Sequence, residues 1–214
     1  MKQINTNIVQ GYKEKDIPFS LYADENKSSN LAIFLPGGGY SVERPLFHYA
    51  TKIFLNRSFD ILHINYQYND SFYDDFSNEE LAEAVKYDVR TVIDKIFGDS
   101  PYENYYLVGK SLGTIAMGTE LKRQIFKNAK AVWLTPLLHR DDVFNAMISS
   151  ENSGLCFIGD NDYCYIEDRY NQLLKNPNIL STLFPKVNHG LEYEDDTPET
   201  IEVLKKIMKE MEQF

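Results

Sequence analysis

Short apolar runs alternate with longer segments of helical period along most of this 214-residue chain. Each run has the length of a buried strand, and the segments between the runs place apolar residues three or four positions apart. Parallel strands need crossover connections, and helices usually form them. The alternation therefore predicts an α/β fold, with a mostly parallel central sheet covered by helices on both faces. The chain length predicts a single domain over residues 1–214.

The expected strands are residues 7–9, 18–22, 31–35, 59–65, 105–108, 131–134, 155–158 and 181–184. The expected helices are residues 45–56, 112–127, 166–174 and 198–211, together with one that runs from the capping-box pair Ser77 and Glu80 to Gly98. The first two strands flank a polar turn, which predicts an antiparallel pair at one edge of the sheet. Residues 66–78 are rich in Asn, Asp and Ser, which predicts an exposed loop.

Composition excludes several classes of protein. The 22 basic and 32 acidic side chains give a formal charge of −10, so we expect no nucleic-acid partner. No window approaches the roughly 18 apolar residues of a membrane-spanning helix, and the first residues lack the apolar core of a signal peptide. The two cysteines, Cys156 and Cys164, are a poor basis for a disulfide framework. We therefore expect a cytoplasmic protein with no membrane partner.

A possible nucleophile lies in the segment Y-Y-L-V-G-K-S-L-G-T, which places Ser111 between Gly109 and Gly113. An apolar run precedes this serine and a helical segment follows it. A sharp strand-to-helix turn needs small flanking residues, because the helix and the strand pack closely there. Such a turn would project the Ser111 hydroxyl from the edge of the sheet. The sequence therefore predicts Ser111 as a catalytic nucleophile.

A nucleophilic serine needs a base, and the base needs an acid that orients it. His189 is the histidine that follows the last expected strand, in K-V-N-H-G-L-E. Asp160 and Asp162 follow the strand before it, in G-D-N-D. Loops that leave the carboxyl ends of parallel strands converge at one edge of the sheet, so these groups can meet Ser111. The residues themselves leave both aspartates open as the acid.

The reaction also needs two backbone N–H donors for the oxyanion. Leu112, the residue after the nucleophile, can supply one. The other can come from Gly38 or Gly39, in the P-G-G-G-Y segment that follows the strand at 31–35, with Tyr40 at the end of that segment. Glycines let this backbone approach a ligand closely.

Together, G-K-S-L-G, P-G-G-G-Y, G-D-N-D and N-H-G resemble the motifs of the α/β-hydrolase fold superfamily, in the chain order Ser, Asp, His. The resemblance covers residues 31 to about 204. It implies a single-domain α/β-hydrolase fold and favours Asp162 over Asp160, because the family commonly places its acid three residues after such a glycine. The activity it implies is that of a serine hydrolase, with no metal and no cofactor, acting on a small carboxylic ester or thioester.

The chain departs from this pattern in two places. Pro36 stands where esterases with an H-G-G-G loop have a histidine, so we expect this loop to be held differently. Only about twenty residues separate Leu134 from the next expected strand, which leaves no room for a large cap. The chain is therefore most similar to the compact, nearly capless subgroup that includes dienelactone-hydrolase-like proteins and small carboxylesterases. An acyltransferase with the same triad, or a non-catalytic binding or regulatory protein on the same fold, is the alternative.

Other motif readings fail. A Walker A loop ending at Gly109, Lys110 and Ser111 would need a glycine where Asn104 stands, and a dinucleotide fingerprint starting at Gly37 fails at Val42. The histidines show no paired metal-ligand spacing, so a zinc hydrolase is disfavoured.

The other histidines have less specific expectations. His63 lies within an apolar strand, which predicts a hydrogen-bonded core residue. His48 and His139 lie near loop or helix ends and are candidates to line a pocket. Five tyrosines near the same sheet edge are further candidates: Tyr40, Tyr66, Tyr68, Tyr163 and Tyr165.

Overall fold

A computed structural model describes residues 3–23, 28–97 and 102–214. Eight strands form one sheet in the order β1-β2-β4-β3-β5-β6-β7-β8. The pairs β1–β2 and β2–β4 are antiparallel, and every other neighbouring pair is parallel. The predicted α/β fold, with its antiparallel edge, is confirmed.

The strands are β1 (Gln3–Gln10), β2 (Asp16–Ala23), β3 (Asn30–Leu35), β4 (Asp60–Ile64), β5 (Asn104–Lys110), β6 (Lys130–Leu134), β7 (Gly154–Gly159) and β8 (Ile179–Phe184). The α-helices are α1 (Pro45–Asn56), α2 (Asn78–Phe97), α3 (Gly113–Glu120), α4 (Asp141–Ile148), α5 (Glu167–Leu173) and α6 (Thr197–Gln213). Short 3₁₀ helices occur at Tyr12–Glu14, Ser71–Tyr73 and Gln124–Phe126.

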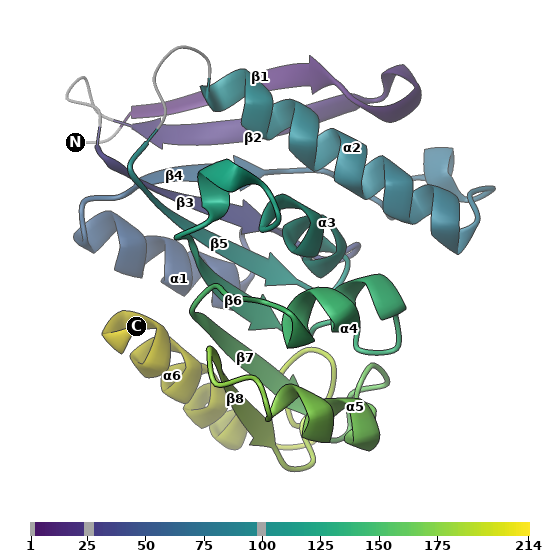
Figure 1. Ribbon diagram of the computed structural model, residues 1–214, viewed down its shortest axis with the longest axis vertical. Helices are drawn as coiled ribbons and strands as arrows, with labels where there is room; N and C mark the ends of the chain where they lie inside the picture. The colour runs from purple at the N-terminus through teal and green to yellow at the C-terminus, as the bar shows by residue number, and fades with distance from the viewer. Residues whose placement is uncertain (1–2, 24–27, 98–101) are drawn as a thin grey trace.

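Helices cover both faces of the sheet (Figure 1). On one face, α1 and α6 pack on a core that includes Phe34, Phe54 and Val108. On the other face, α2 to α5 pack on a core that includes Leu107 and Trp133. Successive residues of β5 thus enter opposite cores, as expected of a strand buried on both faces.

Several local expectations are confirmed. The helix at 45–56 has the expected bounds, with Pro45 in its first turn. The Ser77 hydroxyl accepts a hydrogen bond from the Glu80 backbone N–H (3.1 Å) at the start of α2. The expected end of that helix at Gly98 lies outside the described residues. His63 is a buried core residue whose ring bonds the Thr51 hydroxyl (2.8 Å), and burial lowers its pKa to about 4.

Two local predictions were wrong. The helix expected at 112–127 ends at Glu120, because the backbone becomes extended at Arg123 and Phe126 enters the core from a separate 3₁₀ turn. Apolar spacing continued through the break, so periodicity could not reveal it.

The segment at 66–78 is not simply an exposed loop. Tyr66, Tyr68 and Tyr73 are buried in it. The Tyr68 hydroxyl donates to the buried Asp88 carboxylate of α2 (2.5 Å). Polar composition hid this cluster, because tyrosine rings can bury their area while their hydroxyls stay hydrogen-bonded.

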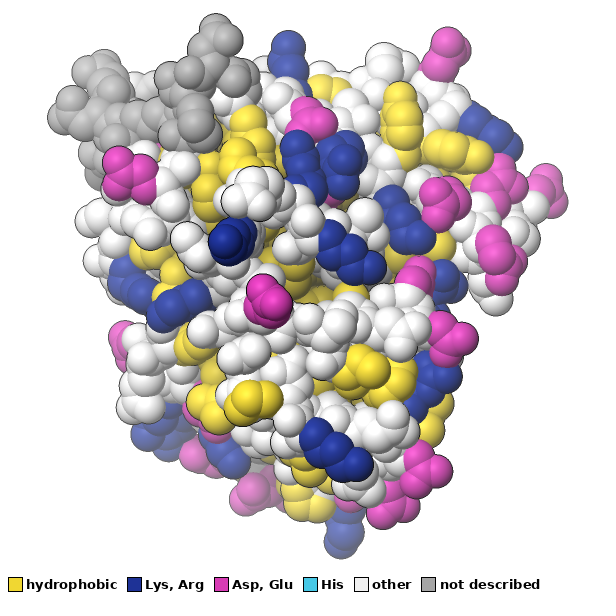
Figure 2. Space-filling model, in the orientation of Figure 1, with side chains coloured by type: hydrophobic (Ala, Val, Ile, Leu, Met, Phe, Trp, Pro, Cys, Tyr) yellow, Lys and Arg dark blue, Asp and Glu magenta, His cyan; other side chains and the backbone are white. Residues whose placement is uncertain are grey.

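The segment between β6 and β7 forms only α4 and short turns, and α4 packs against α3 and α5. It therefore adds no cap over the sheet, as expected. None of the described helices is long and apolar enough to cross a membrane. On the face seen in Figure 2, basic and acidic side chains are interspersed, so that face has no continuous basic surface.

Candidate active site

The turn between β5 and α3 holds Ser111 in a strained conformation. Its φ of 50° is unusual for a non-glycine residue, and its backbone N–H donates to the Leu134 carbonyl of β6 (3.0 Å). A Cβ on Gly113 would lie 2.1 Å from the Leu35 backbone oxygen, so only glycine fits there. A Cβ on Gly109 would meet the flexible Met117 side chain at 3.0 Å. The close approach of α3 to β3 is therefore what forces the turn.

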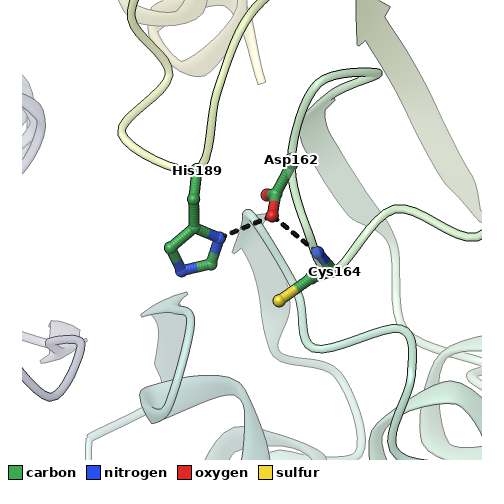
Figure 3. Close-up of side chains that lie close together, drawn as sticks. All are labelled: Asp162, Cys164 and His189. Carbon is green, nitrogen blue, oxygen red and sulfur yellow. Dashed lines mark hydrogen bonds and ion pairs between the residues drawn. The ribbon is translucent and has the colours of Figure 1, made fainter.

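Three side chains from three loops form one hydrogen-bonded chain. His189 Nε2 lies 2.8 Å from Ser111 Oγ, and His189 Nδ1 lies 2.8 Å from Asp162 Oδ1. Figure 3 shows Asp162, on the loop after β7, facing the His189 ring on the loop after β8. A carboxylate that accepts the Nδ1–H leaves Nε2 free to accept the serine proton. The structure thus brings together the three residues expected from the sequence.

Asp162 and Asp160 have different positions in the same turn. Asp162 is buried and also accepts from the Cys164 backbone N–H (2.8 Å). Asp160 is exposed and accepts from the Lys186 backbone N–H (2.5 Å), so it holds the loop and does not contact the imidazole. A Cβ on Gly159 would lie 1.8 Å from the Val187 backbone oxygen. Gly159 therefore allows the loop that carries His189 to cross the end of β7.

The glycine-rich loop lies against the nucleophile. A Cβ on Gly37 would contact the Ser111 Cβ (3.4 Å), and one on Gly38 would contact the Leu112 side chain (3.6 Å), whereas Gly39 has open space around it. Within the described residues, the backbone N–H groups of Gly38, Gly39 and Leu112 donate to no protein acceptor. They are available to a ligand.

The expectation that Pro36 changes how this loop is held has a structural answer. The buried Tyr66 hydroxyl donates to the Pro36 carbonyl (2.6 Å). The Tyr40 hydroxyl, at the other end of the loop, accepts from the Leu46 backbone N–H of α1 (3.1 Å). Two tyrosines therefore fix the loop, and only the tertiary structure could pair them with these backbone groups.

A cleft of about 520 Å³ opens over Ser111. Its walls are Gly37, Gly38, Gly39, Tyr40, Tyr68, Leu81, Lys110, Ser111, Leu112, Leu137, His139, Tyr163, His189 and Gly190. The Tyr163 ring packs on His189 with centroids 4.4 Å apart. Three tyrosines and three leucines among these residues give the cleft apolar surface, which suits an uncharged substrate group.

The remaining pocket candidates fall elsewhere. His48 and Tyr66 line a separate cavity of about 610 Å³ between α1, β2 and β4, which contains none of Ser111, Asp162 and His189. Tyr165 packs on Tyr170 and lines neither cavity. Of the candidates, His139, Tyr40, Tyr68 and Tyr163 do line the cleft over Ser111.

Sequence reasoning missed Lys110 as a residue of the site. This side chain is only 1 % exposed, and its ammonium donates to the Thr135 hydroxyl (2.8 Å) and to the His189 carbonyl (2.7 Å). A lysine that closely follows the apolar run 105–108 was the available signal, because lysine is almost never fully buried without partners.

Asp162, Cys164 and His189 place three potential metal-ligand atoms within 4.8 Å of one another. Asp162 Oδ1 already accepts two hydrogen bonds in this group, one from the imidazole and one from the Cys164 backbone (Figure 3). The arrangement fits an acid that orients a base better than it fits a metal centre.

Comparison with known proteins places the fold. No protein-family model and no curated protein matches the sequence. Solved structures do match over nearly the whole chain. An α/β serine hydrolase homologue from Coxiella burnetii has a TM-score of 0.71 at 12 % identity, covering 98 % of this chain and 96 % of its own. A serine hydrolase without a lid from Xanthomonas campestris has a TM-score of 0.70 at 13 % identity, covering 99 % and 93 %.

A putative α/β hydrolase from Agrobacterium tumefaciens is 20 % identical, with a TM-score of 0.69 and coverage of 98 % and 94 %. All three structures share the architecture described above, including the compact arrangement without a lid in the Xanthomonas protein. This chain therefore has the α/β-hydrolase fold.

Proposed function

We propose that this protein is a serine hydrolase that cleaves a small carboxylic ester or thioester through an acyl-enzyme, without a cofactor. The observation that carries the proposal is the hydrogen-bonded chain from Ser111 through His189 to Asp162, at 2.8 Å for each step. The names of similar structures, which include serine hydrolases and an esterase from Pyrococcus furiosus, agree with it.

In the first half of the reaction, His189 Nε2 takes the Ser111 proton while Oγ attacks the carbonyl carbon of the substrate. The carbonyl electrons move to oxygen, where the N–H groups of Leu112 and Gly38 stabilise the charge. We favour Gly38 over Gly39 because a Cβ built on Gly38 would lie 3.6 Å from the Leu112 side chain, whereas one built on Gly39 would have no neighbour within 4 Å.

The intermediate then collapses. The bond to the alcohol oxygen or thiol sulfur breaks, and the imidazolium returns its proton to that leaving group. Water repeats the sequence on the acyl-enzyme and releases the carboxylic acid. Asp162 stabilises the imidazolium in both halves, which its burial beside the ring favours.

The cleft indicates the size and polarity of the substrate. Tyr68 and Tyr163 give it aromatic walls, and Leu81 and Leu137 give it aliphatic ones. The guanidinium groups near it are already paired: Arg140 with Asp142, and Arg169 with Asp141. We therefore expect short, uncharged acyl groups.

Labelling with a fluorophosphonate tests the proposal. The wild-type protein should label, Ser111→Ala should not, and Ser149→Ala, at the exposed end of α4, should label like the wild type. On p-nitrophenyl esters from acetate to dodecanoate, Ser111→Ala should lower kcat/KM by about 10⁴-fold or more, with the highest wild-type activity on short chains.

A folded wild-type protein that neither labels nor hydrolyses these esters would refute a serine hydrolase. Adding competing alcohols and measuring the products separates hydrolysis from acyl transfer. Carboxylic acid should remain the main product, and a dominant transfer product would replace the hydrolase with an acyltransferase.

A further inference from the structure

Lys110 connects the catalytic loops in a way that the triad reaction does not use. It is the last residue of β5, directly before Ser111, and it is buried. Its ammonium donates to the carbonyl of His189, on the loop that carries the base. It also donates to the hydroxyl of Thr135, directly after β6.

The third direction of the ammonium faces the Tyr40 ring, whose centroid lies 4.9 Å away. An ammonium has three donors and no acceptor, and an aromatic face is a favourable partner for the third. Tyr40 ends the glycine-rich loop, and its own hydroxyl is fixed by Leu46. The Lys110 ammonium thus contacts the loop that carries His189 (the base loop), the glycine-rich loop that ends at Tyr40 (the oxyanion loop) and Thr135 at the end of β6.

The partners of Lys110 are themselves held in place. Thr135 has a φ of 43°, and its backbone N–H donates to the Phe157 carbonyl of β7 (2.8 Å). The His189 carbonyl belongs to the residue whose ring must face both Ser111 and Asp162. A bond at that backbone oxygen therefore restrains the orientation of the imidazole.

Burying a cation is costly unless opposite charge and hydrogen bonds compensate for lost hydration. Asp162, on the loop after β7, supplies the strongest opposite charge, and Glu192, on the loop before α6, supplies a weaker one. Among the described residues, Asp162 Oδ2 is buried without a hydrogen-bond partner, so a nearby positive charge also favours this carboxylate. A methionine would fill the same space without this cost. The cost therefore points to a functional reason for the charge.

We propose that Lys110 is a positioning residue that, through its charged ammonium, holds the His189 loop and the oxyanion loop against the nucleophile. This inference rests on the proposed hydrolase function, and it predicts that the activity of the same site depends on pH through Lys110. The ammonium acts through His189 and Tyr40 and does not touch the substrate's reacting atoms.

The pH dependence follows from the titration of this group. Burial lowers the pKa of Lys110 to about 8, against the opposing influence of Asp162, Cys164 and Glu192. Below pH 8 the ammonium is charged and all three contacts form. Above it the neutral amine keeps two N–H donors, but its two hydrogen bonds are no longer charge-assisted and its attraction to the Tyr40 ring is lost. Activity should therefore fall as the pH rises through about 8.

Stability should change in the opposite direction. A lysine whose folded pKa lies below its unfolded value loses its proton first in the folded state. Between about pH 8 and the ordinary lysine range, the unfolded chain binds more protons, so this group's contribution to stability rises with pH. If Lys110 only supported the fold, activity should not fall over the pH range in which the contribution of Lys110 to stability rises.

The test compares Lys110→Met with Lys130→Met. Lys130 is a matched control, because its ammonium also donates to a backbone oxygen, that of Phe214, and also faces aromatic rings. It lies at the start of β6, at the opposite end of the parallel strands from Lys110, which ends β5. We expect Lys110→Met to lower kcat/KM on p-nitrophenyl acetate by about 10²-fold at pH 7, mainly through kcat.

The pH profile and amide exchange complete the test. Lys110→Met should lack the alkaline fall near pH 8 that the wild type and Lys130→Met show. By hydrogen–deuterium exchange, residues 186–192 and 37–41 should exchange faster at pH 7 in Lys110→Met only. An alkaline limb that persists in Lys110→Met, or unchanged exchange in both segments, overturns the proposal. Absence of Ser111-dependent labelling in the wild type would instead refute the hydrolase function. The exchange measurement would then still decide whether Lys110 holds the two loops in place.

Discussion

The parallel strands end at the carboxyl edge of the sheet and begin at its amino edge. These two edges use similar side chains for different purposes. At the carboxyl edge, Lys110 is fully buried and contacts the loops of the proposed triad. At the amino edge, the half-buried Lys130 bonds the Phe214 backbone and packs on the rings of Tyr106 and Phe214. Both lysines combine a backbone acceptor with an aromatic face, but of the two it is Lys110 that lines the cleft over Ser111.

Backbone strain is also distributed unevenly. Ser111, Thr135, Lys186 and Leu191 have positive φ and lie in loops that leave the carboxyl ends of strands. At the amino edge, the loops lead into the parallel strands. Among the residues described, Ser58, just before β4, is the one non-glycine residue with positive φ in such a loop. Strain persists where surrounding contacts over-determine it, and such places cluster at functional sites.

The amino edge instead ties the end of the chain to the sheet. Arg57 donates to the Tyr106 hydroxyl (3.0 Å), which donates to the Phe214 backbone oxygen (3.1 Å). These groups restrain α6 against α1 and β5. Strand direction therefore decides the role of these residues, because the loops at the carboxyl ends of the strands converge on a cleft.

The largest expected difference is between the two aspartates at the carboxyl edge. Asp162→Asn should lower kcat/KM by about 10⁴-fold, because the amide no longer holds the imidazole in the required tautomer. Asp160→Asn should stay within about threefold of the wild type, since it bonds only the Lys186 backbone. Ester hydrolysis by both variants checks this, and a larger loss in Asp160→Asn would reverse the two roles.

The next difference is between the two glycines around Ser111. Gly113→Ala should cost more than about 4 kcal/mol and abolish folding or solubility, because the new Cβ meets the Leu35 backbone. Gly109→Ala should cost about 1–2 kcal/mol, because the Met117 side chain can move. Urea denaturation of both variants measures the difference, and equal losses would contradict the close approach of α3 to β3.

The smallest effect is expected at the amino edge. Lys130→Met should lower the free energy of unfolding by about 1 kcal/mol, through the lost hydrogen bond and ring contact, and leave kcat/KM within about twofold. Thermal and urea denaturation, with ester hydrolysis, provide the measurement. A tenfold fall in activity without unfolding would show that this edge influences the cleft and that the two edges are not independent.

The sequence predicted the strand pattern well, because buried strands produce continuous apolar runs such as 31–35. It also predicted that Ser111, His189 and one of two aspartates would meet, because loops after parallel strands converge. It did not show that the chain leaves its helix at Arg123, nor that Tyr66 would hold Pro36. Both depend on contacts between residues distant in sequence, which local periodicity does not encode.

By itself, the sequence determined the order of elements, the glycine that the turn at Ser111 requires, and the residue types available at the carboxyl edge. Only the tertiary structure decided that Asp162 and not Asp160 faces the imidazole, that Tyr66 and Tyr40 fix the glycine-rich loop, and that Lys110 is buried among the loops of the proposed triad. Composition and spacing set what each segment can form. Whether a charged side chain such as Lys110 is buried or exposed, and which loops it contacts, is decided only when the sheet brings those loops together.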